Sequence, residues 1–173
     1  RVALVQDRYI LGGNNSSEVR VGLGGRLNIG RYPSLGYLLN EFAPVTKGNA
    51  RPREVYEDER KMRAVLDEEN ITLLTGYRVQ EVVKKSDDTI SAVMAVDTVT
   101  YERIIVRGRL FCDSTGDACL GRLAGAEVHM GREARSEFGE PSAPEVADGM
   151  TMGASVQWYS AEKDAPVHFP DID

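Results

Sequence analysis

The sequence predicts an α/β fold in which buried parallel strands and a helix are followed by an antiparallel meander. Two short apolar runs, at residues 1–6 and 71–75, have the β-branched composition of strands that are covered on both faces of a parallel sheet. The amphipathic stretch between them, at residues 53–70, has the 3.6-residue period of a helix. After Tyr77 the apolar period changes to two, which is typical of antiparallel strands.

Composition and charge exclude several classes of protein. The 173 residues are 42% hydrophobic and 28% charged, an ordinary globular mixture that is sufficient for one domain with a core. The formal net charge is −6, and no basic stripe of the kind that binds nucleic acid is visible. The apolar runs are far shorter than the roughly 20 residues of a membrane span. We therefore expect neither a nucleic-acid nor a membrane partner, favour the cytoplasm, and leave the oligomeric state open.

The N-terminal strand leads into a glycine-rich loop. The strand at residues 1–6 (RVALVQ) is followed at residues 12–17 by GGNNSS, which tolerates positive φ and leaves backbone N–H groups available to an anion. The chain begins in this strand with neither a signal peptide nor an amphipathic leader, which suggests an internal piece of a longer protein. Residues 35–42 (LGYLLNEF) are expected to form a short helix.

The middle of the chain carries the main helix and the meander. Pro52 suits the first turn of the helix at residues 53–70, whose apolar stripe includes Val55, Met62 and Val65. Polar turns then separate strands of alternating character. The three strands of the meander are expected at residues 77–84, 90–97 and 103–106.

Another apolar run precedes a polar turn near the end of the predicted core. Residues 110–113 (LFCD) are expected to form a further buried strand, followed by a turn at residues 114–117 (STGD). Residues 118–126 (ACLGRLAGA) are mostly small, which predicts a short, closely packed helix.

The character of the chain changes after residue 127. The proline- and charge-rich residues 133–149 are expected to form an extended surface connection, and residues 151–159 (TMGASVQWY) a strand. We therefore divide the chain into a core domain at residues 1–127 and, at residues 128–173, a connection into a second, incomplete region that would carry the substrate.

The order of strand, GG loop, helix, strand, meander, strand and TGD turn resembles the FAD-binding core of glutathione-reductase-like flavoproteins, which have two dinucleotide-binding domains. More closely, the chain resembles the bacterial FAD-dependent oxidoreductases whose relatives include heterodisulfide-reductase-like flavoproteins. Three segments carry the resemblance: VALVQDRYILGGNNSS at 2–17, ITLLTGYRVQEV at 71–82 and LFCDSTGDACLGRLAGAE at 110–127. The resemblance implies a Rossmann-like core, FAD as cofactor, and flavin-mediated hydride or electron transfer on an unidentified small organic substrate.

The resemblance also implies which residues of the first segment bind the cofactor. In the family, an acidic residue at the end of the second strand accepts the ribose hydroxyls of adenosine. Gln6 stands at that position beside Asp7, so the two are expected to share the role. Gly12 and Gly13 would let the backbone approach the pyrophosphate or the ribityl chain. The polar partners close to the flavin are expected to be Asn14, Asn15 and Ser16.

Two later positions complete the implied cofactor site. Val79 falls where the family pairs the main chain of a strand with the adenine edge. Thr115 and Gly116 end an apolar strand whose backbone approaches FAD, and Asp117 matches the TGDG variant of the motif, with Ala118 in place of the second glycine. The alternative is that Val79 is an ordinary cross-strand valine and that Asp117 only caps the following helix.

One part of the family pattern is absent. A first strand and a GxGxxG loop would bring a helix N-terminus to the pyrophosphate, but residues 22–27 (GLGGRL) lack the third glycine and follow no clear strand. We therefore expect the core to be incomplete at its N-terminus and this piece alone to be inactive. The sequence assigns no catalytic residue. Four residues either line a substrate pocket or are solvated: Arg20, Arg26, Asn28 and Tyr32.

Other chemistries find little support. Cys112 and Cys119 have neither redox-motif nor zinc-site spacing, and His129 and His168 lack ligand partners, so no metal site is expected. No GxSxG or P-loop lysine motif is present. Two alternatives remain, a nucleotide-binding module without catalysis and an NAD(P)-linked oxidoreductase. The meander argues against the second, because simple dehydrogenases connect those strands through helices.

Overall fold

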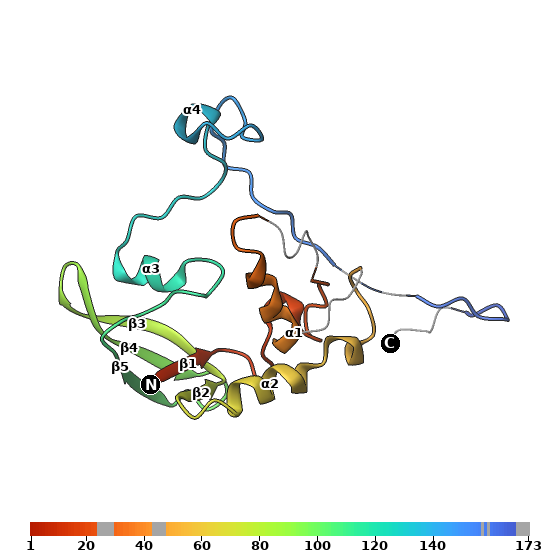
Figure 1. Cartoon of the computed structure of the whole chain (residues 1–173), viewed down its shortest axis with the longest axis horizontal. Coiled ribbons are helices and arrows are strands. Elements are labelled where there is room, and N and C mark those ends of the chain that lie inside the picture. The colour runs from red at the N-terminus through yellow and green to blue at the C-terminus, as the bar shows by residue number, and fades with distance from the viewer. Residues whose placement is uncertain (24–29, 43–47, 157, 159, 169–173) are drawn as a thin grey trace. The chain divides into compact units, whose positions relative to one another are not determined.

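The chain divides into two units, each of which is described by itself. The computed structural model describes residues 1–23, 30–42, 48–156, 158 and 160–168 (Figure 1). The first unit consists of Arg1–Tyr9 and Glu68–Ser155, and the second of Ile10–Asp67 and Val156–Asp173. Strands and helices are both present, so the predicted α/β class is confirmed. The predicted domain boundary at residue 127 stays a prediction.

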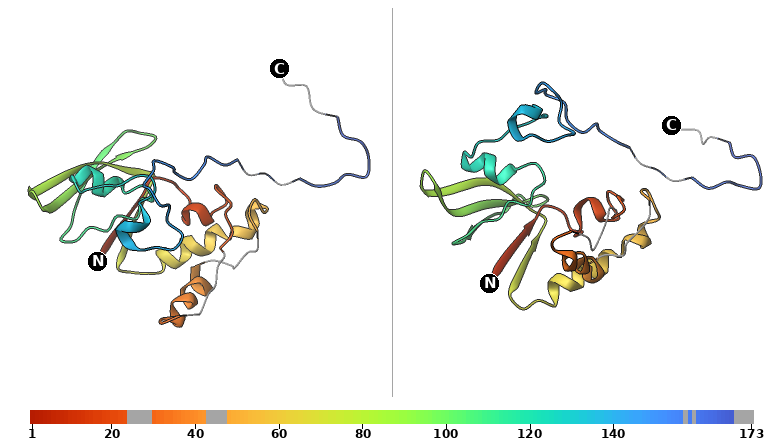
Figure 2. Two further views of the ribbon diagram at one scale, coloured as in Figure 1. Left: turned by 90° about the horizontal axis from the view of Figure 1, so that it is seen from above. Right: turned by 45° about the horizontal axis from the view of Figure 1, so that its top comes forward.

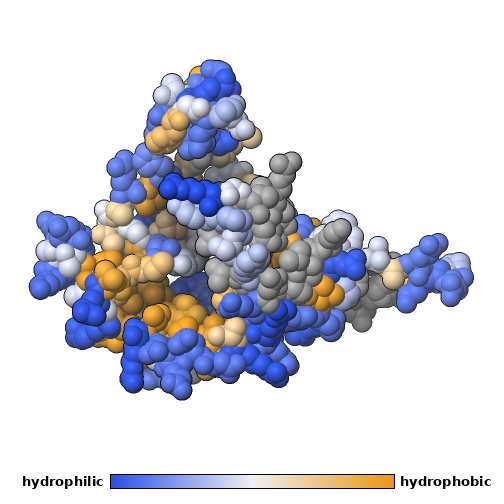
Figure 3. Space-filling model, in the orientation of Figure 1, coloured by the Kyte–Doolittle hydropathy of each residue, from blue (hydrophilic) through white to orange (hydrophobic). Residues whose placement is uncertain are grey.

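Two parallel strands open the first unit, as predicted. β1 (Val2–Gln6) pairs in parallel with β2 (Ile71–Thr75) without a register shift. The prediction that these strands are covered on both faces is wrong for β1, where the side chain of Val2 is 58% exposed. The physical reason is that the parallel sheet has only two strands among the described residues. Figure 3 accordingly shows apolar surface gathered over the strands of this unit.

The predicted meander is confirmed. β3 (Tyr77–Ser86), β4 (Thr89–Asp97) and β5 (Arg103–Arg107) form an antiparallel sheet in the order β3-β4-β5. β4 is the central strand and β3 lies at an edge, where two stretches of irregular pairing interrupt its register with β4. The buried apolar residues of this sheet all belong to β4: Ala92, Val93, Ala95 and Val96.

The segment after the meander differs from the prediction. The expected strand at residues 110–113 is wrong: these residues form no strand, and the side chain of Leu110 is 93% exposed. A strand needs a neighbour for its backbone groups, and no described strand pairs with this run. The following helix is confirmed as α3 (Cys119–Ala124), which lies along β3 in Figures 1 and 2. Its predicted close packing is wrong, because none of its residues is buried. Lys84 Nζ on β3 donates a hydrogen bond of 2.8 Å to the carbonyl oxygen of Ala124.

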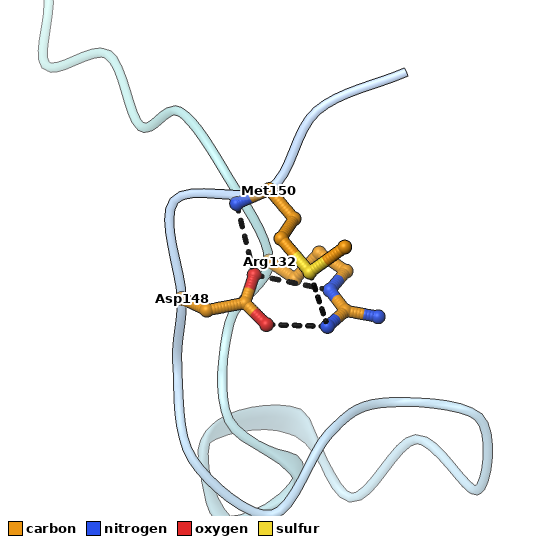
Figure 4. A network of polar contacts seen from close by, with 3 residues as sticks. All are labelled: Arg132, Asp148 and Met150. Carbon is orange, nitrogen blue, oxygen red and sulfur yellow. Dashed lines mark hydrogen bonds and ion pairs between the residues drawn. The ribbon is translucent and has the colours of Figure 1, made fainter. Parts of the chain in front are cut away.

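The predicted extended connection at residues 133–149 is instead a closed loop. It contains a short helix, α4 (Arg135–Phe138), and its ends pair through the antiparallel bridge between Arg132 and Asp148. The Arg132 guanidinium is hydrogen-bonded to both carboxylate oxygens of Asp148, and Met150 N donates to Asp148 Oδ1 over 3.0 Å (Figure 4). The expected strand at residues 151–159 is not found in its described part, because no partner strand is present there.

The second unit is helical. The predicted short helix is confirmed as a 3₁₀ turn at Pro33–Tyr37 that continues into α1 (Leu38–Phe42). The long helix expected at residues 53–70 is wrong in extent, since a 3₁₀ turn at Arg53–Tyr56 precedes a shorter helix, α2 (Asp58–Leu66). Glu57 separates the two with a left-handed φ of 44°, which breaks the helical hydrogen bonding.

The lengths of the helices are relevant to membrane insertion. In the part of the chain that the structure describes, no helix is long and apolar enough to cross a bilayer.

Candidate functional site

The turn before α3 is held by two side chains. Asp113 Oδ1 accepts hydrogen bonds from Thr115 N (2.9 Å) and Thr115 Oγ1 (2.7 Å), and Asp113 Oδ2 accepts one from Gly121 N (2.9 Å). Thr115 Oγ1 in turn accepts a hydrogen bond of 2.9 Å from Cys119 N, the first residue of α3. Asp113 and Thr115 therefore fix the shape of the turn and join it to the helix.

This network favours the ionised form of the Asp113 carboxylate. The N–H of Gly121, followed by the backbone and side chain of Thr115, holds the pKa of Asp113 below its usual value. Sequence reasoning missed Asp113. The signal was its position two residues before Thr115, because an Asp side chain often accepts a hydrogen bond from the backbone two residues on.

The alternative interpretation of Asp117 as the cap of α3 is wrong. The residue before the helix is Ala118, with a left-handed φ of 52°, and no side chain caps the helix from that position. Within the described residues Asp117 makes no hydrogen bond, and Thr115 satisfies the first helical N–H instead. Asp117 is exposed and available to a ligand.

Gly116 lies at the exposed side of this turn. Its φ is 83°, a conformation that favours glycine. A β-carbon at this position would meet no atom of the described chain within 4 Å. Two constraints can therefore be separated at Gly116: the backbone requires glycine for its φ, while the space beside it is open to a ligand.

The main chain of Val79 faces away from the sheet. Thr98 N donates a hydrogen bond of 2.7 Å to the carbonyl oxygen of Gly76, which makes these two residues a hydrogen-bonded pair directly beside the first pair of β3 and β4, Tyr77 and Asp97. Hydrogen-bonded and non-hydrogen-bonded pairs alternate along an antiparallel ladder. The pair of Val79 and Ala95, three positions along, is therefore non-hydrogen-bonded, and the N–H and C=O of Val79 are directed outward at the edge of the sheet.

Gln6 and Asp7 lie at the end of β1, as predicted. Asp7 Oδ2 accepts hydrogen bonds from Arg78 Nη2 (2.9 Å) and Nε (3.3 Å), in an ion pair that the sequence did not indicate. Asp7 Oδ1 accepts no hydrogen bond from the described residues, so it remains available to a hydroxyl group. Gln6 is half-buried and, like Asp7, has a partner within the chain.

In the second unit, the two glycines of the loop at residues 12–17 have different roles. Gly12 has a φ of 115°, and a β-carbon there would lie 2.6 Å from the Asn15 carbonyl oxygen and 2.8 Å from Lys61 Cδ. The chain itself therefore requires glycine at position 12. Gly13 also has a positive φ, of 54°, but the space beside it is open. Only Gly13 leaves room for a ligand next to the backbone.

The polar residues of this loop are mostly committed to its own structure. Ser16 Oγ donates a hydrogen bond of 2.7 Å to the carbonyl oxygen of Gly13, and Asn15 Nδ2 donates one of 2.9 Å to that of Val21. Asn14 is exposed, whereas Asn15 is only 8% exposed. Asn15 Oδ1 is buried and has no hydrogen-bond partner among the described residues. Such an acceptor is costly unless a ligand or water supplies a donor.

Three residues outside the loop support it, and sequence reasoning missed all three. Tyr56 is fully buried, and its hydroxyl donates a hydrogen bond of 2.6 Å to the carbonyl oxygen of Arg20. Asp58 Oδ1 accepts a hydrogen bond of 3.0 Å from Ser17 N. Lys61 packs beneath Gly12 and donates to the carbonyl oxygen of Tyr56.

The residues considered for a substrate pocket divide into two groups. Arg26 and Asn28 lie outside the described residues. Arg20 supports the loop, since its Nε donates a hydrogen bond of 3.0 Å to the carbonyl oxygen of Ser17. Tyr32 is exposed, with the Arg31 guanidinium 5.3 Å from its ring centre. The described geometry of Arg20 thus assigns it a structural role.

One protein family is similar to this chain over most of its length. A family model described as FAD dependent oxidoreductase matches residues 1–169. The match continues past residue 127, the predicted boundary of the core domain. No curated protein and no solved structure matches the chain.

Proposed function

Since the chain belongs to the family of FAD dependent oxidoreductases, we propose that it binds FAD and takes part in the transfer of hydride or electrons to or from a small organic molecule. The flavin, when bound, supplies the redox chemistry. The residues of this chain would bind the cofactor, orient it and keep its polar groups satisfied.

The open space beside Gly116 is the observation that best supports a cofactor-binding role for the turn at residues 114–117. Asp113 and Thr115 hold this turn in one shape, so its exposed backbone is pre-organised. The open space beside Gly116 fits the close approach of a flat or extended group, which any larger side chain would obstruct. We propose that Thr115 and Gly116 present backbone to FAD and that Asp117 adds a polar contact.

The loop at residues 12–17 supports FAD binding in a complementary way. Gly13 leaves its backbone accessible, and the buried Asn15 Oδ1 fits a hydroxyl or N–H donor of the cofactor. Asn14 is exposed and can make a second polar contact. Gly12 and Ser16 would act indirectly, by fixing the conformation of the loop.

Adenosine would be bound by the first unit. The outward N–H and C=O of Val79 offer a donor and an acceptor of the kind that pairs with an adenine edge. Asp7 Oδ1 would accept a ribose hydroxyl, while Arg78 holds Oδ2 and so fixes the carboxylate. Gln6 would share the ribose through its amide oxygen.

Flavin spectroscopy tests this function directly. The full-length protein, purified with its cofactor, should be yellow. Its flavin absorbance should bleach under anaerobic conditions when a reducing substrate from a panel of small organic alcohols, hydroxy acids and carbohydrates is added. A control sample reduced with dithionite gives the full amplitude. A colourless protein that takes up no added FAD would contradict the proposal.

A further inference from the structure

Lys61 is a buried lysine that is not among the residues proposed to contact the cofactor. Its side chain is on α2 and is only 7% exposed, although lysine is seldom buried without a strong partner. Among the described residues, the only hydrogen bond of its side chain is the one that Nζ donates to the carbonyl oxygen of Tyr56. Burial lowers the pKa of this amine, whereas the carboxylates of Asp58 and Glu57 favour its charged form.

The methylene stem of Lys61 occupies a specific place under the loop at residues 12–17. A β-carbon at Gly12 would lie 2.8 Å from Lys61 Cδ and 3.0 Å from Cε, so the stem fills the space on that side of Gly12. Gly12 in turn sets the loop conformation, since its carbonyl oxygen accepts a hydrogen bond of 3.0 Å from Asn15 N. The stem of Lys61 and the carbonyl oxygen of Asn15 therefore both lie close beside Gly12.

The same short stretch of chain anchors the far end of the loop. Asp58 Oδ1 accepts the hydrogen bond from Ser17 N, and the Tyr56 hydroxyl donates to the carbonyl oxygen of Arg20. Those two contacts fix the loop after residue 16. Lys61 is the support beneath its beginning, where Gly13 and Asn15 lie.

We propose that Lys61 is a positioning residue for FAD, acting through Gly12 to hold Gly13 and Asn15 in the orientation that binds the cofactor. This inference rests on the proposed function and deepens it. The stem is the essential part, because it fills the space under the loop, and the amine fixes the stem by its bond to Tyr56. Without the stem, the loop can sink into the vacated space and Asn15 Oδ1 loses its fixed direction.

The test compares three variants of the holoprotein by FAD dissociation constant, visible circular dichroism of the bound flavin, and melting temperature. Lys61→Ala removes the stem and should weaken FAD binding by about tenfold or more, a size comparable to the loss of an outer-shell partner at a metal site. Lys61→Met keeps an unbranched stem and should restore most of the affinity and the flavin signal. Arg63→Ala is the control, because Arg63 is on the same helix with its side chain 76% exposed.

The outcomes separate this inference from the proposed function. Folded Lys61→Ala protein with the dissociation constant and flavin signal of the wild type would overturn the positioning role, even if its melting temperature is lower. Should Lys61→Ala fail to fold, Lys61→Met and the shorter Lys61→Leu are compared instead, and equal FAD affinities for these two would overturn it. A wild-type protein that binds no FAD would contradict the proposed function itself.

Discussion

At the scale of single residues, the GG loop at residues 12–17 and the STGD turn at residues 114–117 show that similar sequence signals arise from different constraints. Gly12 is required both by its φ and by contacts within the chain, whereas Gly116 is required by its φ alone and has open space beside it. A glycine that a ligand can approach has open space beside it, as Gly13 and Gly116 do, but Gly139, outside the proposed site, has open space as well. The distinction leads to a matched experiment.

Gly116→Ala should weaken FAD binding, and Gly139→Ala should not. Both glycines have a left-handed φ, 83° and 70°, and a β-carbon at either would meet nothing within 4 Å. Each alanine therefore costs a similar strain of about 1–2 kcal/mol, measured by thermal or urea unfolding. Only the alanine at position 116 should raise the FAD dissociation constant, because only there does the open space receive the cofactor. Equal FAD affinities in the two variants would remove Gly116 from the site.

At the scale of elements, α2 serves as the support of the loop at residues 12–17 rather than as an ordinary surface helix. Its first residue, Asp58, bonds to the loop, and Lys61 packs beneath it one turn later. The helix was predicted from its apolar residues, which do not indicate that it supports the loop. Lys61 lies four residues before Val65, which places a charged residue on the apolar face, and this was the available signal.

Asp58→Ala should destabilise the protein more than Glu59→Ala. Both residues are in the first turn of α2, where a negative charge is favourable, so the helix-dipole contribution is lost from each. Asp58→Ala additionally leaves Ser17 N without its hydrogen bond, which should cost about 1–2 kcal/mol more. Urea unfolding of the two variants measures the difference. Indistinguishable midpoints would show that the bond to Ser17 contributes nothing to stability.

The elements also show how much the sequence could reveal. β1, β2 and the meander were predicted because their apolar period is local information. The strand expected at residues 110–113 failed because composition alone does not supply a neighbouring strand. The long helix at residues 53–70 was overextended because the break at Glu57 follows a fully buried Tyr56, whose hydroxyl binds Arg20 far away in the sequence.

The candidate site follows the same rule. Its glycine-rich loop and TGD turn were recognisable from motifs, but the supporting residues were not. Arg78 reaches Asp7 across 71 positions of the chain, and Asp58 reaches Ser17 across 41. Contacts of this range depend on how the chain folds back, and no periodicity in the sequence reports them.

At the scale of the whole molecule, the titratable groups with shifted pKa values are unevenly distributed. Four carboxyls in the first unit have lowered pKa values because of hydrogen bonds to their charged forms: Asp88, Asp97, Asp113 and Asp148. In the second unit, burial lowers the pKa of the Lys61 amine. The two units should therefore respond differently to pH.

Hydrogen exchange against pH should show this difference. A carboxyl with a lowered folded-state pKa stabilises the fold above its unfolded pKa of 3.8, and that stability is lost as the pH falls through the lower folded value. Protection of β4 and α3 should decrease in that acid range. Lys61 binds protons more readily when unfolded, so protection of α2 should increase as the pH rises toward the unfolded value of 10.5. The alkaline increase should be absent in Lys61→Met, and its persistence there would assign it to another group.

The edge of β3, whose outward N–H and C=O at Val79 are proposed to pair with adenine, also bears on aggregation. An unpaired strand edge is a template on which another chain can add a strand. β3 limits this hazard by its irregular pairing, first after Val79 and again around Lys84, which disturbs the flat edge that a second chain would need. Lys84 and Lys85 add positive charge to the same strand. Before the first irregularity, the pairing of β3 with β4 is regular only from Tyr77 to Val79. A stretch of this length can accept a small ring system, but it is too short for a foreign strand to pair along it.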